Sequence, residues 1–351
     1  MKCGCCGCWG LLLATLTASL LFALGYFFVL ENEWYFAAVI RLQQACPPWL
    51  EEHYPALPEQ EVARALQPRQ RSPLPFTTII VVVPTPRAWA DRRALLRAQF
   101  HRSQRLLPPG TSATLLFVLG GAPPLGAQGH PDEHYAPQCL DIDTNGGWDY
   151  STEHSSTTCK VLAGVAAAAE RWSFLYLARV GDDAYFRVDA FLRRVAPWHA
   201  GENLALGRWL PAGSTGEKAA VWMGGPPGYE LRGHGPYLGG MGYVLSANVT
   251  LALAQTQALT GLLDGAPEDL LTGSWLQPMS HARFARVDSP CFHNAATPQP
   301  AGKAFFASTR SRHWGAAACT PSTLLVHYMT PELWQSIDED GLLECGNTHL
   351  F

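Results

Sequence analysis

The first half of the chain alternates between short apolar runs and longer stretches of mixed polarity. The runs "TTIIVVVPT" (77–85), "SATLLFVLGG" (112–121) and "FLYLAR" (174–179) predict buried strands, and the first of them is rich in β-branched residues. Between them, helical patterns extend over 90–107 and 155–172. Strands and helices in alternation predict an α/β fold with a mixed, mainly parallel sheet.

The second half is richer in Gly and Pro and carries fewer clear elements. It contains a strand-like piece, "YLGGMGYVLS" (237–246), and a predicted helix, "PEDLLTGSWLQ" (267–277). A last strand–helix pair follows in "STLLVHYMTPELWQSI" (322–337). We expect these elements to belong with the first half to one large domain, residues 76–351.

An uncharged apolar run occupies residues 9–30 and is long enough to span a hydrocarbon core of about 30 Å. A cleaved signal peptide is the alternative, but the run exceeds a usual signal core and no A-x-A site precedes "ENEW". Because Lys2 precedes the run and acidic residues follow it, residues 1–8 are predicted to be cytosolic and the large remainder lumenal. The segment 31–75, rich in Pro and charge, is predicted to be a stem.

Composition and charge narrow the function classes. The chain is 48% hydrophobic and 15% charged, so it can bury a core. The net charge is -4 and no run of basic residues is present, so the sequence does not indicate a nucleic-acid-binding protein. Of the 10 cysteines, those of the cytosolic tail are candidates for S-palmitoylation, and the lumenal ones suggest disulfides. The sequon at Asn248 predicts N-glycosylation.

Two carboxylates, Asp182 and Asp183, follow the predicted strand 174–179 directly. An uncompensated buried carboxylate costs several kcal/mol, on the order of the desolvation penalties of ions. Ligands of parallel sheets gather at the carboxyl ends of strands, and a hard divalent cation held by oxygen would compensate the charge. The alternative is that Asp183 caps the helix that begins near Val188.

The segment "FLYLARVGDDAYFRV" (174–188) resembles the strand and DDD motif of the β1,3-glycosyltransferases, glycosyltransferase family 31. Five further segments resemble motifs of that family in the same order: "RRALLRAQF", "TTCKVL", "YLGGMGYVLS", "PEDLLTG" and "LLVHYMTPELW". The resemblance covers roughly residues 77–337. It implies a GT-A nucleotide-sugar-binding fold and a type II Golgi membrane protein. The implied reaction is inverting, metal-dependent transfer of galactose from UDP-galactose to a glycan or glycoconjugate acceptor.

The resemblance also implies site residues. Asp183 and His327 match the ligands of Mn²⁺ or Mg²⁺, and Asp269 matches the general base. Asp182 matches the middle Asp of the DDD motif, whereas Gly181 replaces the first. The residues expected to bind the donor are Asp182, Arg93, Arg97 and Lys160; those expected to bind the acceptor are Gly239, Gly240 and Tyr243.

Several alternatives stay open at this point. Asp269 also suits an ordinary acidic helix N-terminus, and His327 a buried core histidine. His293 is a rival metal ligand, and UDP-N-acetylglucosamine is the second choice of donor. The departure at Gly181 also allows a catalytically silent relative that binds glycans. The segment "CLDIDT" (139–144) is interpreted as a loop after a strand, with no role in the family.

Overall fold

The computed structural model describes residues 48–68, 72–124, 130–141, 150–210, 237–260, 268–269, 272–273, 276, 285–289, 291–294, 323–327 and 334. The predicted membrane span, residues 9–30, lies outside these ranges, as do the cytosolic tail and the first part of the predicted stem. Within the described ranges, no helix combines the length and the apolar character that crossing a bilayer requires.

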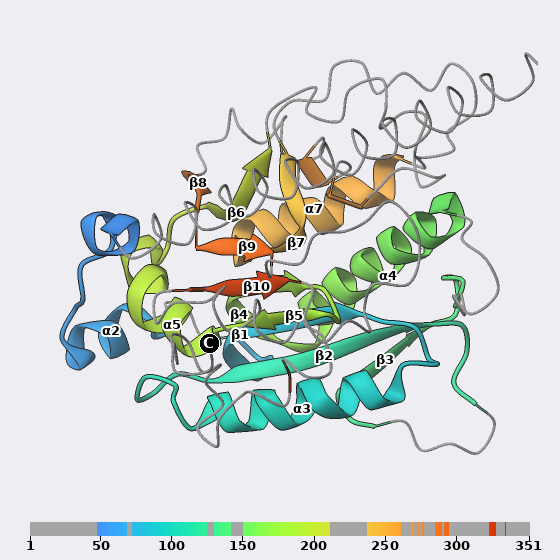
Figure 1. The fold of residues 1–351 in the computed structure, drawn as a ribbon, viewed down its shortest axis with the longest axis horizontal. Coiled ribbons are helices and arrows are strands. Elements are labelled where there is room, and N and C mark those ends of the chain that lie inside the picture. The colour runs from blue at the N-terminus through green and yellow to red at the C-terminus, as the bar shows by residue number, and fades with distance from the viewer. Residues whose placement is uncertain are drawn as a thin grey trace, which may run out of the picture.

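A seven-stranded sheet forms the centre of the molecule, in the order β3-β2-β1-β4-β7-β6-β8. Neighbouring strands from β3 to β4 are parallel, β7 is antiparallel to both β4 and β6, and β8 is parallel to β6. The predicted α/β class with a mixed, mainly parallel sheet is therefore confirmed (Figure 1). The strands are β1 (Phe76–Pro84), β2 (Ala113–Gly120), β3 (Glu133–Ala136), β4 (Ser173–Val180), β6 (Leu204–Leu210), β7 (Tyr237–Ser246) and β8 (Ala285–Asp288).

Helices cover the two faces of this sheet: α3 (Ala90–Gln104) on one, α4 (Tyr150–Arg171) and α7 (Ala247–Thr260) on the other (Figure 1). Alternate residues of β1 supply both cores, since successive side chains of a strand point to opposite faces. Val81 packs in the same cluster as Phe100 of α3, and Val82 in the cluster of α4. Gly164 lets α4 approach closely, because a Cβ there would lie 2.6 Å from Val82 Cγ1 and 2.8 Å from Val118 Cγ2.

A second, three-stranded sheet in the order β5-β10-β9 lies beside the end of β4. Its strands are β5 (Ala184–Phe186), β9 (Phe292–Asn294) and β10 (Leu325–His327). β5 begins directly after the aspartate pair, and its Ala184 pairs with His327 across the antiparallel ladder. This small sheet therefore brings a histidine from the end of the chain to the carboxyl end of β4.

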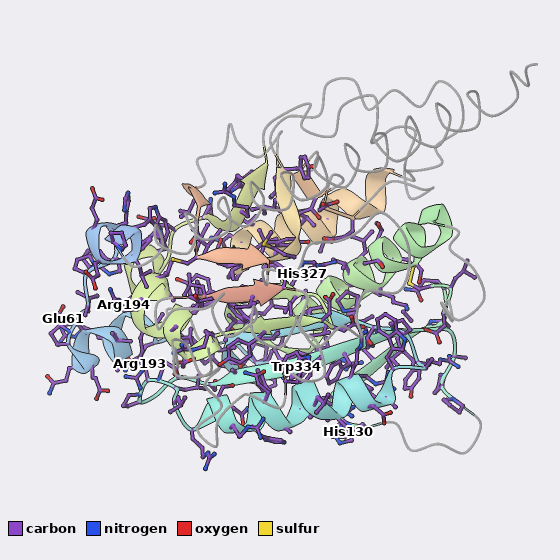
Figure 2. All side chains as sticks on the ribbon, in the orientation of Figure 1. Glu61, His130, Arg193, Arg194, His327 and Trp334 are labelled. Atoms are coloured by element: carbon purple, nitrogen blue, oxygen red, sulfur yellow. A yellow bond between two sulfur atoms is a disulfide. The ribbon has the colours of Figure 1, made fainter. Side chains whose placement is uncertain are left out.

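Part of the segment predicted as stem packs on the domain. A helical turn over 48–53 and α2 (Glu59–Ala65) bury Leu50 and Leu66 in the cluster that covers one face of the main sheet. The elements that contact α2 are η2 (Phe191–Val195) and η3 (Ala196–His199), which follow α5 (Val188–Ala190) in the chain. Figure 2 shows Arg193 and Arg194 at the end of the molecule where α2 lies, and Arg193 pairs with Glu59 at 2.9 Å.

Candidate functional site

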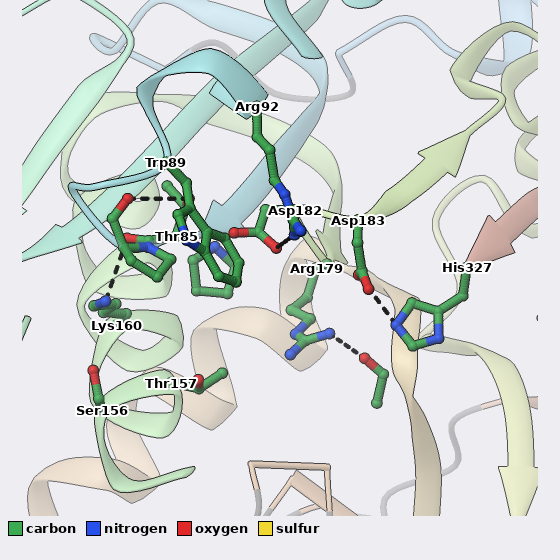
Figure 3. Close-up of a pocket in the computed structure, with 14 residues that line it drawn as sticks. Thr85, Trp89, Arg92, Ser156, Thr157, Lys160, Arg179, Asp182, Asp183 and His327 are labelled. Carbon is green, nitrogen blue, oxygen red and sulfur yellow. Dashed lines mark hydrogen bonds and ion pairs between the residues drawn. The ribbon is translucent and has the colours of Figure 1, made fainter. Parts of the chain in front are cut away.

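A pocket opens where β1 and β4 end (Figure 3). It is lined by the turn after β1, the first described turns of α4, the end of β4, and single residues of β7 and β10. The lining residues are Pro84, Thr85, Pro86, Trp89, Arg92, Ser156, Thr157, Lys160, Arg179, Gly181, Asp182, Asp183, Gly240 and His327. The position matches the expectation that ligands bind at the carboxyl ends of parallel strands.

Asp183 and His327 face each other in this pocket (Figure 3), with Asp183 Oδ1 3.2 Å from His327 Nε2. Burial acts to raise the pKa of Asp183, but His327, Arg92 and a backbone hydrogen bond together lower it below its ordinary value. A carboxylate oxygen and an imidazole nitrogen at this distance are a donor pair that suits Mn²⁺. Among the described side chains, no group of three or more His, Cys, Asp or Glu gathers as a complete metal site. The two residues could therefore hold an ion whose remaining ligands come from substrate and water.

Asp182 is the more deeply buried carboxylate of the pair. Its side chain is 10% exposed, and its Oδ2 has no hydrogen-bond partner within the described part of the chain. Burial and the neighbouring charge of Asp183 raise the pKa of Asp182 to about 7. Arg92 offsets part of that rise from 3.6 Å, while its guanidinium lies 4.1 Å from the centroid of the Trp89 ring. An orphaned carboxylate oxygen in a pocket fits a site completed by a cation or a hydrogen-bond donor.

Lys160 forms the floor of the pocket on the α4 side. Its ammonium donates to the carbonyl of Thr85 and to Asp141 Oδ1, both at 3.3 Å. Burial lowers the pKa of Lys160, against the opposing effect of Asp141. The Asp141 carboxylate also accepts the backbone N–H of Arg87 at 3.2 Å, so it ties the turn after β1 to α4.

A disulfide between Cys139 and Cys159 fixes the loop that carries Asp141. Cys159 is adjacent to Lys160 on α4, so the bridge holds the loop next to the pocket floor. The bridge agrees with the predicted oxidising compartment, and Cys291 is disulfide-bonded as well.

Asp269 lies beside Gly240, a residue of the pocket wall. A Cβ added to Gly240, which lines the pocket, would lie 3.3 Å from Asp269 Oδ2. The described residues around Asp269, namely Glu268, Thr272, Gly273 and Leu276, are helical, in line with the predicted helix over 267–277. Because residue 240 is a glycine, no side chain separates the Asp269 carboxylate from the pocket at this point.

Two glycosyltransferases of known activity are similar to this chain in sequence. The chain is 23% identical over 287 residues to N-acetyllactosaminide β-1,3-N-acetylglucosaminyltransferase 4 of Mus musculus, covering 78% of this chain and 73% of the relative. The enzyme of the same name from Homo sapiens is 24% identical over 221 residues, covering 59% and 55%. The chain is thus similar in sequence to β1,3-N-acetylglucosaminyltransferases. The family resemblance and the hexosyltransferase class predicted from the motifs are confirmed by this relation.

The chain was also compared with protein-family models and with solved structures. No protein-family model matches the chain. A solved structure of the galactosyltransferase LgtC with donor and acceptor sugar analogues is 12% identical, covers 72% of this chain and 87% of its own, and has a TM-score of 0.34. A second LgtC structure, that of an active-site mutant, is 11% identical and has a TM-score of 0.33.

Of the arginines in the "RRALLRAQF" segment, Arg92 lies at the pocket, whereas Arg93 and Arg97 do not line it. Arg93 is buried, pairs with Glu133 at 3.2 Å and donates to backbone carbonyls of the turn after β1. Arg97 pairs with Asp132 at 2.8 Å and with Glu133 at 2.7 Å. Both therefore connect α3 to the edge of β3, and their predicted donor contact has no support from this placement.

Of the residues predicted to bind the acceptor, one lines the pocket and two do not. Gly240 lines the pocket, but Gly239 and Tyr243 do not. Tyr243 is buried, and its hydroxyl donates to Glu268. The sequon residue Asn248 is exposed at the start of α7, where its amide donates to Asn203 Oδ1 at 3.2 Å. The side chain of His293, the rival metal ligand, lies outside the described residues, so that alternative stays open.

Gly181 stands where the family motif has its first Asp. A Cβ at this position would lie 2.9 Å from Asp183 Oδ1 and 3.8 Å from His327 Cδ2. A side chain at position 181 would therefore require the Asp183 carboxylate to move. Sequence reasoning did not single out Trp89, Asp141 or Arg179. The "CLDIDT" segment contained one signal, since its first aspartate is Asp141.

Proposed function

We propose that this protein is an inverting, metal-dependent β1,3-glycosyltransferase of GT-A fold that transfers a hexose from a UDP-sugar to a glycan hydroxyl. The observation that carries the proposal is the meeting of three distant segments, two of which line one pocket while the third lies beside Gly240 in its wall. Asp183 comes from the end of β4, His327 from β10, and Asp269 from the helix next to Gly240. An ordinary helix cap at Asp183 and a core histidine at 327 would not require this meeting.

On the donor side, Asp183 and His327 would hold Mn²⁺ or Mg²⁺. When bound, the ion would stabilise the negative charge that develops on the departing diphosphate. Arg92 lies at the pocket mouth with 42% of its side chain exposed, so its guanidinium can turn from Asp182 toward that diphosphate. Trp89 and the hydroxyl groups of Ser156 and Thr157 line the remaining wall, which suits a nucleoside with a flat base and a ribose.

On the acceptor side, Asp269 would act as general base. The acceptor hydroxyl passes its proton to the Asp269 carboxylate as its oxygen bonds to the anomeric carbon of the donor. The bond between that carbon and the β-phosphate oxygen breaks, and its electron pair leaves with UDP. Because attack comes from the face opposite UDP, the anomeric configuration inverts. Gly240 leaves space next to Asp269 for the sugar that carries the hydroxyl.

We predicted galactose first from the motifs. The two sequence relatives are N-acetylglucosaminyltransferases, which favours UDP-N-acetylglucosamine as the donor to compare with UDP-galactose. The predicted membrane span at 9–30 and the disulfide at Cys139 support a type II protein of the Golgi with a lumenal domain.

The proposal is tested with the full chain purified in detergent. UDP binding is measured by calorimetry with Mn²⁺ and with EDTA, and hydrolysis and transfer are measured over a panel of UDP-sugars. We expect UDP binding that requires the metal and turnover of one UDP-hexose. A folded protein without metal-dependent UDP binding would instead favour the catalytically silent relative, the candidate that Gly181 motivates.

A further inference from the structure

A buried ion pair lies directly behind the proposed acceptor side. Arg179, near the end of β4, lines the pocket with a side chain that is 7% exposed. One arm of its guanidinium, Nη2, lies 3.0 Å from Glu268 Oε2. The other arm, Nη1, donates to the carbonyl of Gly240 (Figure 3). The arginine therefore connects β4, β7 and the helix that contains Glu268.

Further contacts fix the Glu268 carboxylate from its other side. Glu268 Oε1 accepts the hydroxyl of Tyr243 and, at 3.2 Å, the hydroxyl of Thr272. Tyr243 is the register partner of Arg179 across the β4–β7 ladder. Burial and the adjacent carboxylate raise the pKa of Tyr243 well above its ordinary value, so the phenol stays a donor. All four side chains are buried, so Glu268 has one fixed orientation.

Such a pair is expensive to bury. Removing two charges from water costs several kcal/mol per ion, and apolar side chains of the same volume often give equal or greater stability. Stability alone therefore does not explain why the chain places Arg179 and Glu268 here. The residues next to the pair offer an explanation. Glu268 immediately precedes Asp269 in the chain, and Gly240, whose carbonyl Arg179 binds, lies next to the Asp269 carboxylate.

We propose that the Arg179–Glu268 pair is the positioning device for Asp269, holding the base and the Gly240 backbone in one geometry against the donor pocket. This inference rests on the proposed function, in which Asp269 is the general base. Arg179 acts on both sides of Asp269: it fixes the preceding residue through the ion pair and the facing glycine through the carbonyl. Asp183 and Asp269 are both among the carboxylates that raise the pKa of Arg179, so this cation interacts with the metal-ligand side and with the base.

The test uses the full chain and two substitutions that keep the volume of the pair, Glu268→Gln and Arg179→Lys. We measure kcat, the KM of the acceptor and metal-dependent UDP affinity. A displacement of the base by about 1 Å costs up to about 10²-fold in turnover. We therefore expect kcat to fall by about 10–10²-fold in Glu268→Gln, with UDP affinity within about twofold of wild type. Arg179→Lys, which keeps the charge, should retain more turnover than Arg179→Met.

Arg187→Met is the matched control. Arg187 forms a similar pair with Asp189, at 2.8 Å with side chains 13% and 7% exposed, but it does not line the pocket. We expect this control to lose stability without a change in kcat. Thr272→Val removes a single donor to Glu268 and is the variant to use if the charge substitutions fail to fold; kcat should then fall about threefold or more.

Unchanged kcat in folded Glu268→Gln or Thr272→Val would overturn the positioning role, as would a loss of kcat in Arg187→Met equal to that in Arg179→Met. Equal loss of UDP affinity and kcat would also count against it, because the pair would then support the whole pocket. A failure of the proposed function has another signature: the wild-type chain itself would lack metal-dependent UDP binding.

Discussion

Removing the disulfide between Cys139 and Cys159 should lower the free energy of unfolding, and it should also lower the affinity of the pocket for UDP. The two cysteines are separated by 20 residues, and closing a loop of that length restricts the unfolded chain. The chain-entropy relation gives about 3 kcal/mol at 25 °C for such a loop. The same bridge holds the loop that carries Asp141, the partner of Lys160 in the pocket floor.

The measurement is urea unfolding of the Cys139→Ala/Cys159→Ala double variant in the full chain. Substitution is preferable to a reductant, because Cys291 is also disulfide-bonded and would be reduced too. With an m-value of about 2–3 kcal/mol/M, the midpoint should fall by about 1 M urea. Metal-dependent UDP affinity should also fall at temperatures where the variant is folded.

Leu140→Ala is the control within the same loop, since Leu140 is 61% exposed and should leave the midpoint almost unchanged. A shift below about 0.3 M in the double variant would refute the entropy argument for this bridge. A full shift with unchanged UDP affinity would separate the two claims: the bridge would stabilise the fold while Asp141 has no part in nucleotide binding.

Four further outcomes are expected. Asp269→Asn should lower turnover by about 10²-fold or more while UDP affinity stays the same, and surviving turnover would place the base elsewhere. Asp183→Ala should remove the Mn²⁺ dependence of UDP binding, which calorimetry with and without EDTA checks. Leu66→Ala, in the segment predicted as stem, should cost about 2–5 kcal/mol in urea unfolding because the side chain is fully buried; a cost near zero would mean that this segment is only a spacer. For Glu133, burial acts to raise the pKa, but Arg97 and Tyr135 lower it below its ordinary value near 4.5. Its contribution to stability is therefore present above that value and lost as pH falls through the lowered pKa. The stability difference between wild type and Glu133→Gln should shrink in acid, and a constant difference from about pH 7 to about pH 3 would contradict this.

The sequence alone determined the elements with a strong local period. The apolar runs at 77–85, 112–121 and 174–179 correspond to β1, β2 and β4, with ends that agree within a few residues. Those runs are long enough to show a buried pattern without help from their neighbours. The short strands β3, β5 and β9 have only three or four residues each, and such strands show no period that a sequence pattern can detect. β10 is as short, but it lies within the apolar run of the strand–helix pair predicted over 322–337.

The resemblance of the motifs to those of the β1,3-glycosyltransferases identified Asp183, His327 and Asp269 as site candidates, whereas the local sequence of Asp269 and His327 also suits a helix N-terminus and a core histidine. The meeting of Asp183 and His327 in one pocket was decided by the tertiary structure, since the β5–β10 pairing that places His327 beside Asp183 joins segments far apart in the chain. The position of Asp269 beside Gly240 in the pocket wall was decided in the same way.

Which arginine faces the pocket was likewise beyond the sequence. Arg92, Arg93 and Arg97 share one helix and one charge, and local pattern gives no reason to prefer any of them. Only the position of β3 decides the matter: its Glu133 and the adjacent Asp132 engage Arg93 and Arg97, which leaves Arg92 at the pocket beside Asp182. Charge is a property of a residue, but what a charge binds depends on the partners that the fold brings to it.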